Sequence, residues 1–354
     1  MSAVSAHPGS LAATGQFLLN TWYVAALSSD VGRTPHAVRI CGEPLVFYRT
    51  EGGRAVAMQD RCPHRLAPLS LGTVQGDAIQ CAYHGIKFDC SGRCVEIPGD
   101  ARTGDRLPQQ FDVPSYATQE AAGFVWVWLG DQALASSTPL PPFTDYLEKS
   151  GWERFQGYQY TKADVALVID NLLDLSHEAF LHPKTIGNVA VGESPAKTMV
   201  LEKTIEVERL MPNCPPPVMF KKAAGFSGNI DRYQRVVFTP PAFCIVVRAT
   251  PVTGSTGESL EWFVHHLLTP EKTGSTHYFF ALTRNFALGN PTVTETLRQG
   301  AVRTLDEDRV MLEAQQCTLM EVPLESRRLH TSFDGAPTAG RKLMERLLSE
   351  ESQL

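Results

Sequence analysis

The first third of the chain is a series of short apolar runs separated by turn residues. Runs at residues 45–48, 56–58 and 124–129 are rich in Val, Phe, Tyr and Trp, and a glycine pair separates the first two. Runs of this length bounded by turn residues predict β-strands. We therefore expect a small all-β domain, which we place at residues 17–135.

A proline-rich segment at residues 136–142 interrupts this pattern. Proline has no amide hydrogen and fits poorly inside strands or helices, so the segment is typical of a linker. We place the second domain at residues 145–354 and treat residues 1–16 as a flexible N-terminus.

The second domain combines strand-like stretches with helices. One helix is expected to begin at Asn290 and Pro291, because asparagine caps helices and proline suits the first helical position. Another covers roughly residues 339–349, where apolar side chains recur every fourth residue. The fold class expected for the whole chain is α+β.

Composition and charge narrow the class of protein. The chain has 354 residues, 43% of them hydrophobic and 20% charged, as in a globular protein of two domains. A formal charge of -6 argues against nucleic acid as a partner, although a local basic pocket could still hold a small anion. The first 32 residues lack Lys and Arg and no apolar run reaches the length of a membrane span, so we expect a cytoplasmic protein that binds no membrane.

Two short motifs place cysteine beside histidine. Cys62 and His64 form C-x-H, and after sixteen intervening residues Cys81 and His84 form C-x-x-H. Two thiolates can hold one iron and two neutral imidazoles the other, as in a 2Fe-2S cluster of the Rieske type. A zinc site could use the same ligands, but zinc fingers usually space their cysteines C-x2-4-C and their histidines H-x3-5-H. The spacing therefore favours the cluster.

A second pair of histidines follows in the C-terminal domain. His177 and His182 are five residues apart, which corresponds to roughly 140° on an ideal helix. Both imidazoles can reach one metal only if the helix distorts or ends between them. Pro183 favours this, because the residue before a proline is pushed out of helical geometry.

The helix that begins at Pro291 supplies a candidate carboxylate. Its apolar face is expected to contain Leu297, Ala301, Leu305, Asp308 and Leu312. An inward carboxylate needs a partner or a metal, because burial of an unpaired charge is costly. Together with the two histidines, Asp308 would complete a 2-His-1-carboxylate triad that leaves positions on Fe(II) open for O2.

Neighbouring acids are given other roles. Asp306 and Glu307 fall off the apolar face of that helix, so we expect them to be solvated surface acids. Asp174 lies one helical turn before His177, and its flanking leucines suggest burial. We expect its side chain to be the acceptor that orients a ligand imidazole.

With these residues in place, the chain resembles the Rieske oxygenases, and within them the group of vanillate O-demethylase, dicamba O-demethylase and toluenesulfonate methyl-monooxygenase. The similarity extends beyond the ligands to residues 21–25, 62–70, 81–85, 170–174 and 276–280. It implies a β-rich Rieske domain, a catalytic domain with a curved antiparallel sheet and helices, and a homotrimer. In that trimer the residue matching Asp174 would bridge a cluster histidine of one subunit and an iron histidine of its neighbour.

The same resemblance implies that His266 contacts the substrate. On a strand neighbouring side chains face opposite ways, so one of His265 and His266 should face inward and the other outward. The alternative is that His266 is a structural histidine.

The chain lacks G-x-G-x-x-G after a strand, other flavin or nicotinamide motifs, and a plant-type C-x4-C-x2-C run. We therefore expect no flavin or nicotinamide on this chain, and electrons from a separate reductase with flavin and a ferredoxin-type cluster that uses NAD(P)H. The expected reaction is O-demethylation of a methoxy aromatic acid similar to vanillate, isovanillate or veratrate, with O2 consumed and formaldehyde released.

Three alternatives stay open. Within oxygenases, the enzyme could hydroxylate the ring or an aryl methyl group of an aromatic acid. Outside them, the chain could be a Rieske electron carrier without catalysis. A carrier needs only the β-domain, so the second iron site argues against it.

Overall fold

The computed structural model describes residues 17–100, 102, 107–142, 144–322, 329 and 331–353. Residues 1–16, expected to be a flexible N-terminus, lie outside this set. The chain divides into two compact units, and each is described by itself. One contains Leu18–Leu140 and Thr269–Lys272, and the other contains Pro141–Leu268 and Thr273–Leu354.

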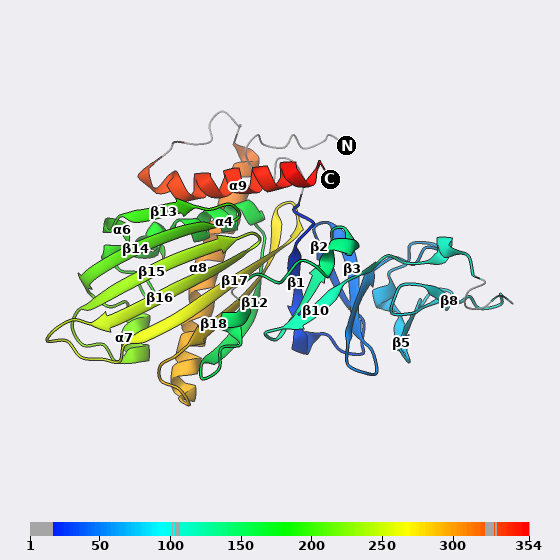
Figure 1. Cartoon of the computed structure of the whole chain (residues 1–354), viewed down its shortest axis with the longest axis horizontal. Coiled ribbons are helices and arrows are strands. Elements are labelled where there is room, and N and C mark those ends of the chain that lie inside the picture. Colours follow the sequence, from blue (N-terminus) through cyan, green and yellow to red (C-terminus); the bar gives the residue numbers. More distant parts are fainter. Residues whose placement is uncertain are drawn as a thin grey trace. The chain divides into compact units, whose positions relative to one another are not determined.

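The first unit is built from short antiparallel strands in three sheets (Figure 1). The runs expected to be strands at 45–48 and 56–58 lie in strands, and the run at 124–129 does so up to Trp128. In sheet order, the strands are β1 (Trp22–Leu27), β11 (Phe124–Trp128) and β10 (Thr118–Ala121); β2 (His36–Ile40), β3 (Glu43–Arg49), β4 (Ala55–Gln59) and β9 (Ser115–Tyr116); and β5 (Thr73–Gln75), β6 (Ala78–Gln80), β7 (Lys87–Phe88) and β8 (Cys94–Glu96).

Four residues from late in the sequence complete this unit. The Thr269 hydroxyl donates to the carbonyl of Val24 at 2.7 Å. The amide of Cys41 donates to the carbonyl of Pro270, also at 2.7 Å. The expected division left residues 269–272 in the second domain, and the structure differs there because these backbone and side-chain bonds join them to the first unit.

The second unit contains one seven-stranded antiparallel sheet, the curved sheet in Figure 1. This confirms the expected antiparallel sheet with helices. In sheet order, its strands are β12 (Glu153–Thr161), β18 (Ser275–Arg284), β17 (Leu260–Lys272), β16 (Ala242–Pro251), β15 (Ile230–Thr239), β14 (Ile205–Cys214) and β13 (Ala196–Val200).

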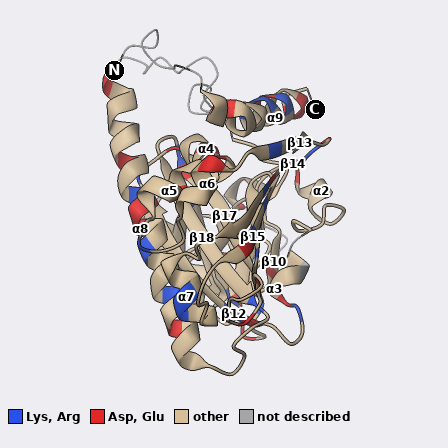
Figure 2. Cartoon of the chain, turned by 90° about the vertical axis from the view of Figure 1, so that its left-hand side faces the viewer, with Lys and Arg blue, Asp and Glu red and all other residues tan. Residues whose placement is uncertain are grey.

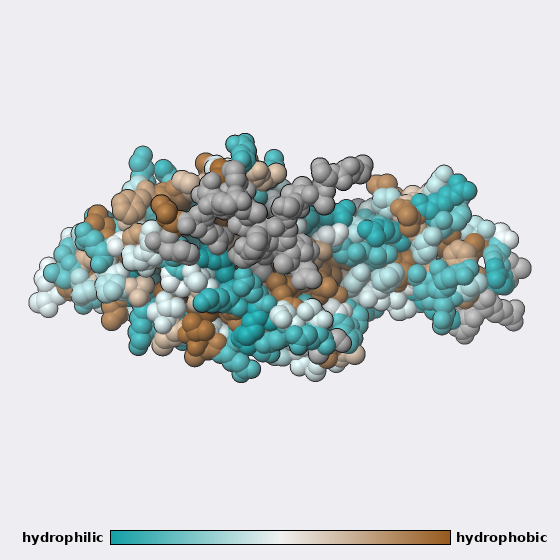
Figure 3. All heavy atoms as spheres, turned by 90° about the horizontal axis from the view of Figure 1, so that it is seen from above, coloured by the Kyte–Doolittle hydropathy of each residue, from teal (hydrophilic) through white to brown (hydrophobic). Residues whose placement is uncertain are grey.

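Helices of very different length accompany the sheet. The described α-helices of this unit are α3 (Thr144–Leu147), α4 (Val165–Leu173), α5 (Glu178–Leu181), α6 (Val189–Glu193), α7 (Val218–Ala224), α8 (Pro291–Glu321) and α9 (Gly335–Glu351), and the short α2 (Gln132–Ala135) belongs to the first unit. None of the described helices combines the length and apolarity needed to cross a bilayer. Figure 3 shows hydrophilic and hydrophobic side chains intermixed on the parts of one face that are not grey.

The longest helix, α8, begins as the sequence predicted. The Asn290 side chain accepts hydrogen bonds from the amides of Thr292 and Val293, and Pro291 is the first helical residue. The buried side chains of α8 include Leu297, Leu305, Asp308 and Leu312, which confirms the predicted apolar face. Lys, Arg, Asp and Glu residues occur at intervals along the helix (Figure 2).

Helix α4, which leads into the histidine pair, packs closely against α9. A Cβ at Gly340 would lie 2.3 Å from a methyl carbon of Leu173, so a larger residue there would require that methyl group to move. Asp170 and Arg341 form an ion pair at 2.6 Å beside the contact. The end of α4 is thereby held in place, and with it the segment that carries the two histidines.

Candidate metal centres and cavity

The first candidate centre lies on two matching turns of the first unit. Cys62 and Cys81 are buried, whereas His64 and His84 are exposed. The Cys62 thiol is close enough to the Cys81 thiol for the second to raise the pKa of the first, and the two imidazole rings lie 4.6 Å apart between centroids. The structure therefore brings the four residues together as a buried sulfur pair and an exposed imidazole pair.

The backbone closes both turns in the same way. Cys62 donates its amide to the carbonyl of Ala67, and Cys81 does the same to Ile86, each at 2.8 Å. Leu66 and Gly85 donate back to the carbonyls of the respective cysteines. Both have positive φ, 58° and 74°. The turns thus present their ligands through main-chain geometry within a few residues of each motif.

The donor set suits a two-iron cluster better than a single ion. Burial and the neighbouring Cys81 thiol raise the pKa of Cys62 to about 11, so two thiolates side by side require a cation. Among the described residues, no three members of this set offer ligand atoms that all lie within 4.8 Å of one another. A tetrahedral zinc site would need all four to converge on one ion. A split into a sulfur side and an imidazole side fits a cluster in which each iron takes one pair.

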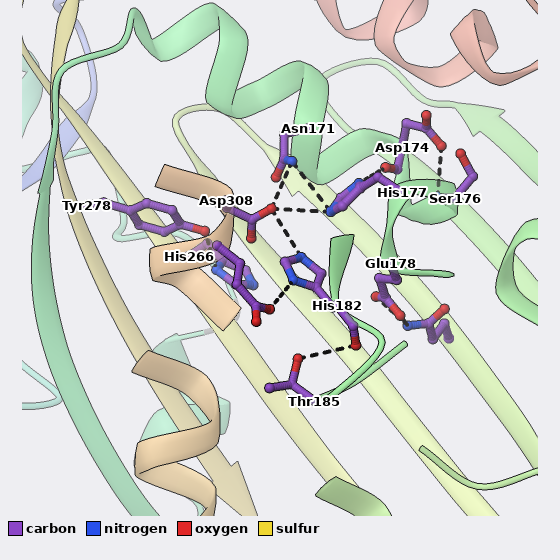
Figure 4. A network of polar contacts seen from close by, with 12 residues as sticks. Asn171, Asp174, Ser176, His177, Glu178, His182, Thr185, His266, Tyr278 and Asp308 are labelled. Carbon is purple, nitrogen blue, oxygen red and sulfur yellow. Dashed lines mark hydrogen bonds and ion pairs between the residues drawn. The ribbon is translucent and has the colours of Figure 1, made fainter. Parts of the chain in front are cut away.

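The second candidate centre joins His177, His182 and Asp308 (Figure 4). One ligand atom from each lies within 4.8 Å of the others. The Nε2 atoms of His182 and His177 lie 3.1 and 3.4 Å from the same Asp308 oxygen. A metal ion that prefers six ligands would take three from these residues and would keep its other coordination positions for small ligands.

The local backbone explains how two histidines five residues apart can face one point. Helix α4 ends at Leu173, a single 3-10 turn covers Leu175–His177, and α5 then runs over Glu178–Leu181. His182 follows with φ -116° and ψ 39°, just before Pro183. The expectation that the helix must distort or end around these residues is confirmed.

Each imidazole is held through its other nitrogen. His177 donates from Nδ1 to the main-chain carbonyl of Asp174 at 2.6 Å, and His182 donates from Nδ1 to the carboxylate of Glu307 at 2.9 Å. These bonds fix the ring orientations and keep a proton on each Nδ1, so release of the Nε2 proton that each ring shares with Asp308 would free a lone pair for a metal.

Both partners differ from what the sequence predicted. The group of Asp174 that accepts from His177 is its carbonyl, because the side chain caps the next turn and accepts from the amide of Ser176 at 3.0 Å. Glu307 was expected to be a solvated surface acid, which is wrong: it contacts the buried His182. Helix periodicity places Glu307 beside the apolar stripe, and its reach to α5 depends on tertiary packing.

Electrostatics favour a charged Asp308. Burial raises the pKa of its carboxyl, but hydrogen bonds with the two imidazoles outweigh this and hold it well below its usual range. Asn171 adds a neutral donor, with its amide 3.1 Å from the same carboxylate oxygen. No role was predicted for Asn171 from the sequence, although its position one turn before Asp174 on the same helix face was a usable signal.

A cavity of about 90 Å³ lies beside this triad, which is room for more than one water. Most of its walls are apolar, from the sheet, α4, α7 and α8. Its lining also contains Asn171, the three triad residues and His266. Mostly apolar walls with a few polar groups are typical of a site for a small organic ligand.

His266 lines this cavity. The Tyr278 hydroxyl lies 2.7 Å from its Nδ1, and burial raises the pKa of that phenol, so the hydroxyl keeps its proton and can donate it to Nδ1. Burial also lowers the pKa of His266 to about 4, so the ring is neutral, and in the tautomer that accepts from Tyr278 its proton sits on Nε2 and can be donated to a ligand. His266 lines the cavity and His265 does not, which agrees with the expectation that the two side chains face opposite ways, although His265 is buried as well.

Family models match both parts of the chain. Residues 21–117 match the Rieske [2Fe-2S] domain, and residues 161–350 match the vanillate O-demethylase oxygenase C-terminal domain. Among known proteins, the vanillate O-demethylase oxygenase subunit of a Pseudomonas strain is 34% identical over 95% of this chain and 96% of its own. The toluene-4-sulfonate monooxygenase system iron-sulfur subunit of Comamonas testosteroni is also 34% identical, over 95% of this chain and 98% of its own.

Solved structures show the same similarity. The crystal structure of dicamba monooxygenase bound to 3,6-dichlorosalicylic acid superposes with a TM-score of 0.87 and 30% identity, over 96% of this chain and 99% of that chain. A structure of the same enzyme with non-haem iron and dicamba superposes with a TM-score of 0.78.

Proposed function

The chain belongs to the Rieske oxygenases of the vanillate O-demethylase type, and from this premise we propose that it O-demethylates a methoxy aromatic acid as the oxygenase component of a two-component monooxygenase. The observation that carries the proposal is the triad of His177, His182 and Asp308 beside an apolar cavity. An electron carrier would need neither.

We assign the metal ligands from the two donor sets. Cys62 and Cys81 would hold one iron of a 2Fe-2S cluster, and His64 and His84 the other. His177, His182 and Asp308 would hold one Fe(II). When bound, the cluster supplies electrons and the single iron activates O2 for insertion into a C–H bond.

The chain's own residues prepare the substrate for this step. The apolar walls exclude water and hold the ring, while the Nε2–H of His266 donates to a carboxylate or ring oxygen and turns the methoxy group toward the triad. One oxygen atom of O2 enters the methyl C–H bond, and the other leaves as water with two electrons from NAD(P)H. The hydroxymethyl ether is a hemiacetal, which collapses to a phenol and formaldehyde.

The proposed reaction needs electrons from outside this chain, and this need determines the partner proteins. We propose a separate reductase with flavin and a ferredoxin-type cluster, which draws on NAD(P)H in the cytoplasm. We also propose a homotrimer in which Asp174 links the cluster of one subunit to the iron of the next. The related proteins are components of multicomponent systems, which supports a separate reductase.

A screen of methoxybenzoates with a competent reductase tests the reaction. At least one of them should release formaldehyde in step with NAD(P)H and O2 consumption, and a phenol should appear in equal amount. Ring-hydroxylated or hydroxymethyl products without formaldehyde would replace O-demethylation by ring or aryl-methyl hydroxylation. An iron content of two per chain and no product would instead identify an electron carrier.

A further inference from the structure

Three cavity-lining side chains away from His266 have unused hydrogen-bonding capacity. Arg232, Gln234 and Trp262 are each 2% exposed and line the cavity beside the triad. Among the described residues, Arg232 Nε, Gln234 Oε1 and Trp262 Nε1 are buried without a hydrogen-bond partner. Buried polar groups are nearly always satisfied in proteins, so three unpaired atoms on residues that line one cavity are the starting point for a missing ligand group.

The three side chains lie on one part of the sheet. Gln234 of β15 pairs with Val247 of β16, which in turn pairs with Trp262 of β17. Arg232 is two residues before Gln234 and therefore points from the same face. The ring of Phe220 joins the ends of this group, because it packs edge-on against Trp262 at 4.7 Å and under the Arg232 guanidinium at 4.9 Å.

The charge of this group is already neutralised. Arg232 Nη2 donates to Glu178 at 2.9 Å, and the Gln234 amide donates to the same carboxylate at 2.9 and 3.2 Å. Both members of the ion pair are buried. An anionic ligand group placed here would meet the Glu178 carboxylate in a medium of low dielectric constant, so the missing group is neutral.

The unused atoms define the chemistry of that group. Arg232 Nε–H and Trp262 Nε1–H are donors, and Gln234 Oε1 is an acceptor. A hydroxyl has two lone pairs and one O–H, which is the complementary set. We propose that Arg232, Gln234 and Trp262 form a hydroxyl-binding subsite, so that the substrate is an aromatic ring with a free hydroxyl besides the group that is oxidised. The choice of an aromatic rests on the proposed function.

Binding to the iron-loaded enzyme without O2 or reductase tests the subsite. The probes are 3-methoxybenzoate, its ring-hydroxylated isomers, and the matching dimethoxy and dicarboxylate compounds, titrated by calorimetry. One hydroxylated isomer should bind about tenfold more tightly than 3-methoxybenzoate, and conversion of its hydroxyl to methoxy or carboxylate should abolish the gain.

Variants assign the gain to the three side chains. Trp262→Phe keeps a ring but removes the indole donor, so it should reduce the preference for the hydroxyl about three- to tenfold. Gln234→Leu provides a second reading if Trp262→Phe does not fold. Trp152→Phe is the matched control, because Trp152 stacks on Phe263 and does not line the cavity.

Two outcomes would overturn the subsite: no hydroxylated isomer is preferred, or the Trp262→Phe and Gln234→Leu variants weaken all probes equally. Either result would mean that the three atoms bind ordered water only. Formaldehyde release is measured separately with reductase present. A hydroxylated probe that binds through Trp262 without formaldehyde release would preserve the subsite and reject O-demethylation.

Discussion

In the Cys/His centre the imidazoles stand on surface turns, whereas in the His/Asp centre His182 and Asp308 are buried and ion-paired. The turns of the first are closed by bonds within each motif, between residues five or fewer positions apart. The second joins His182 to Asp308 across 126 positions of sequence. One centre is therefore a local structure, and the other is a product of tertiary packing.

This difference suits different tasks. Exposed imidazoles can be approached by another protein, as an electron acceptor must be. A triad with two buried members and a half-buried His177, beside an apolar cavity, limits the access of water to a reactive site. Substitutions that affect one centre and spare the other test whether the two differ in this way.

The largest effect is expected at the exposed centre. His64→Ala or His84→Ala should abolish the absorbance and electron paramagnetic resonance signal of the cluster and all reductase-supported turnover, because each iron needs both of its protein ligands. The main-chain bonds that close the turns do not involve the imidazoles, so the variants should stay folded. Tyr83→Phe, in the same exposed turn, is the control. Persistence of both signals in either histidine variant would refute the cluster assignment.

At the buried centre, Asp308→Ala should remove the single iron and leave the cluster spectrum intact. Iron content should fall from three to two per chain, since two imidazoles without the carboxylate bind Fe(II) weakly. Asp306→Ala removes an acid two residues earlier on the exposed side of α8 and should retain all three irons. A full iron complement in Asp308→Ala would mean that another carboxylate is the ligand.

The link between the centres is tested by Asp174→Asn. The structure makes this variant selective: an asparagine oxygen can still accept from Ser176, and His177 is held by the main-chain carbonyl. Both metals should therefore remain while transfer between them stops. Single-turnover product from enzyme with a reduced cluster should fall to background. A normal yield would remove Asp174 from the electron path.

The residues that could be predicted from the sequence are those whose arrangement depends on local patterns. The C-x-H and C-x-x-H motifs contain their own geometry, so their four residues could be grouped without a structure. Asp308 could also be predicted, because a carboxylate on an apolar stripe is a strong local signal. Its burial is confirmed. The strands and the start of α8 followed from apolar runs and from Asn290 with Pro291.

What the sequence could not supply depends on packing between distant elements. Glu307 contacts His182 because tertiary packing brings α8 next to the residue that follows α5. The contacts of Arg232 and Gln234 with Glu178 form because β15 packs against the start of α5. Residues 269–272 join the first unit through bonds to Val24 and Cys41, which no periodicity reveals.

A smaller effect is expected in the cavity. His266→Ala removes one donor to the substrate, so the apparent KM should rise ten- to hundredfold, in line with a loss of about 1.5–3 kcal/mol for a bond to a charged group. O2 use should also uncouple from formaldehyde release, with three irons retained. Tyr278→Phe, which keeps the ring but no longer holds Nδ1, should show a weaker form of the same defect. An unaltered KM and coupling would make His266 a structural residue.

The smallest effect should come from Glu307→Gln. The amide oxygen of glutamine can still accept the Nδ1 proton of His182, so the ring orientation is kept, but the negative charge that makes the imidazole a stronger ligand is lost. We expect affinity for the single iron to fall about tenfold, the lower end for loss of such a partner, with the cluster unchanged. Asp306→Asn is the matched control, because it removes the same charge from the adjacent residue, whose contacts are with Gln159 and Arg309 instead. Competition with a chelator under anaerobic conditions measures both. Equal iron loss from the two variants would mean that the general charge of α8 matters, and the specific contact of Glu307 with His182 does not.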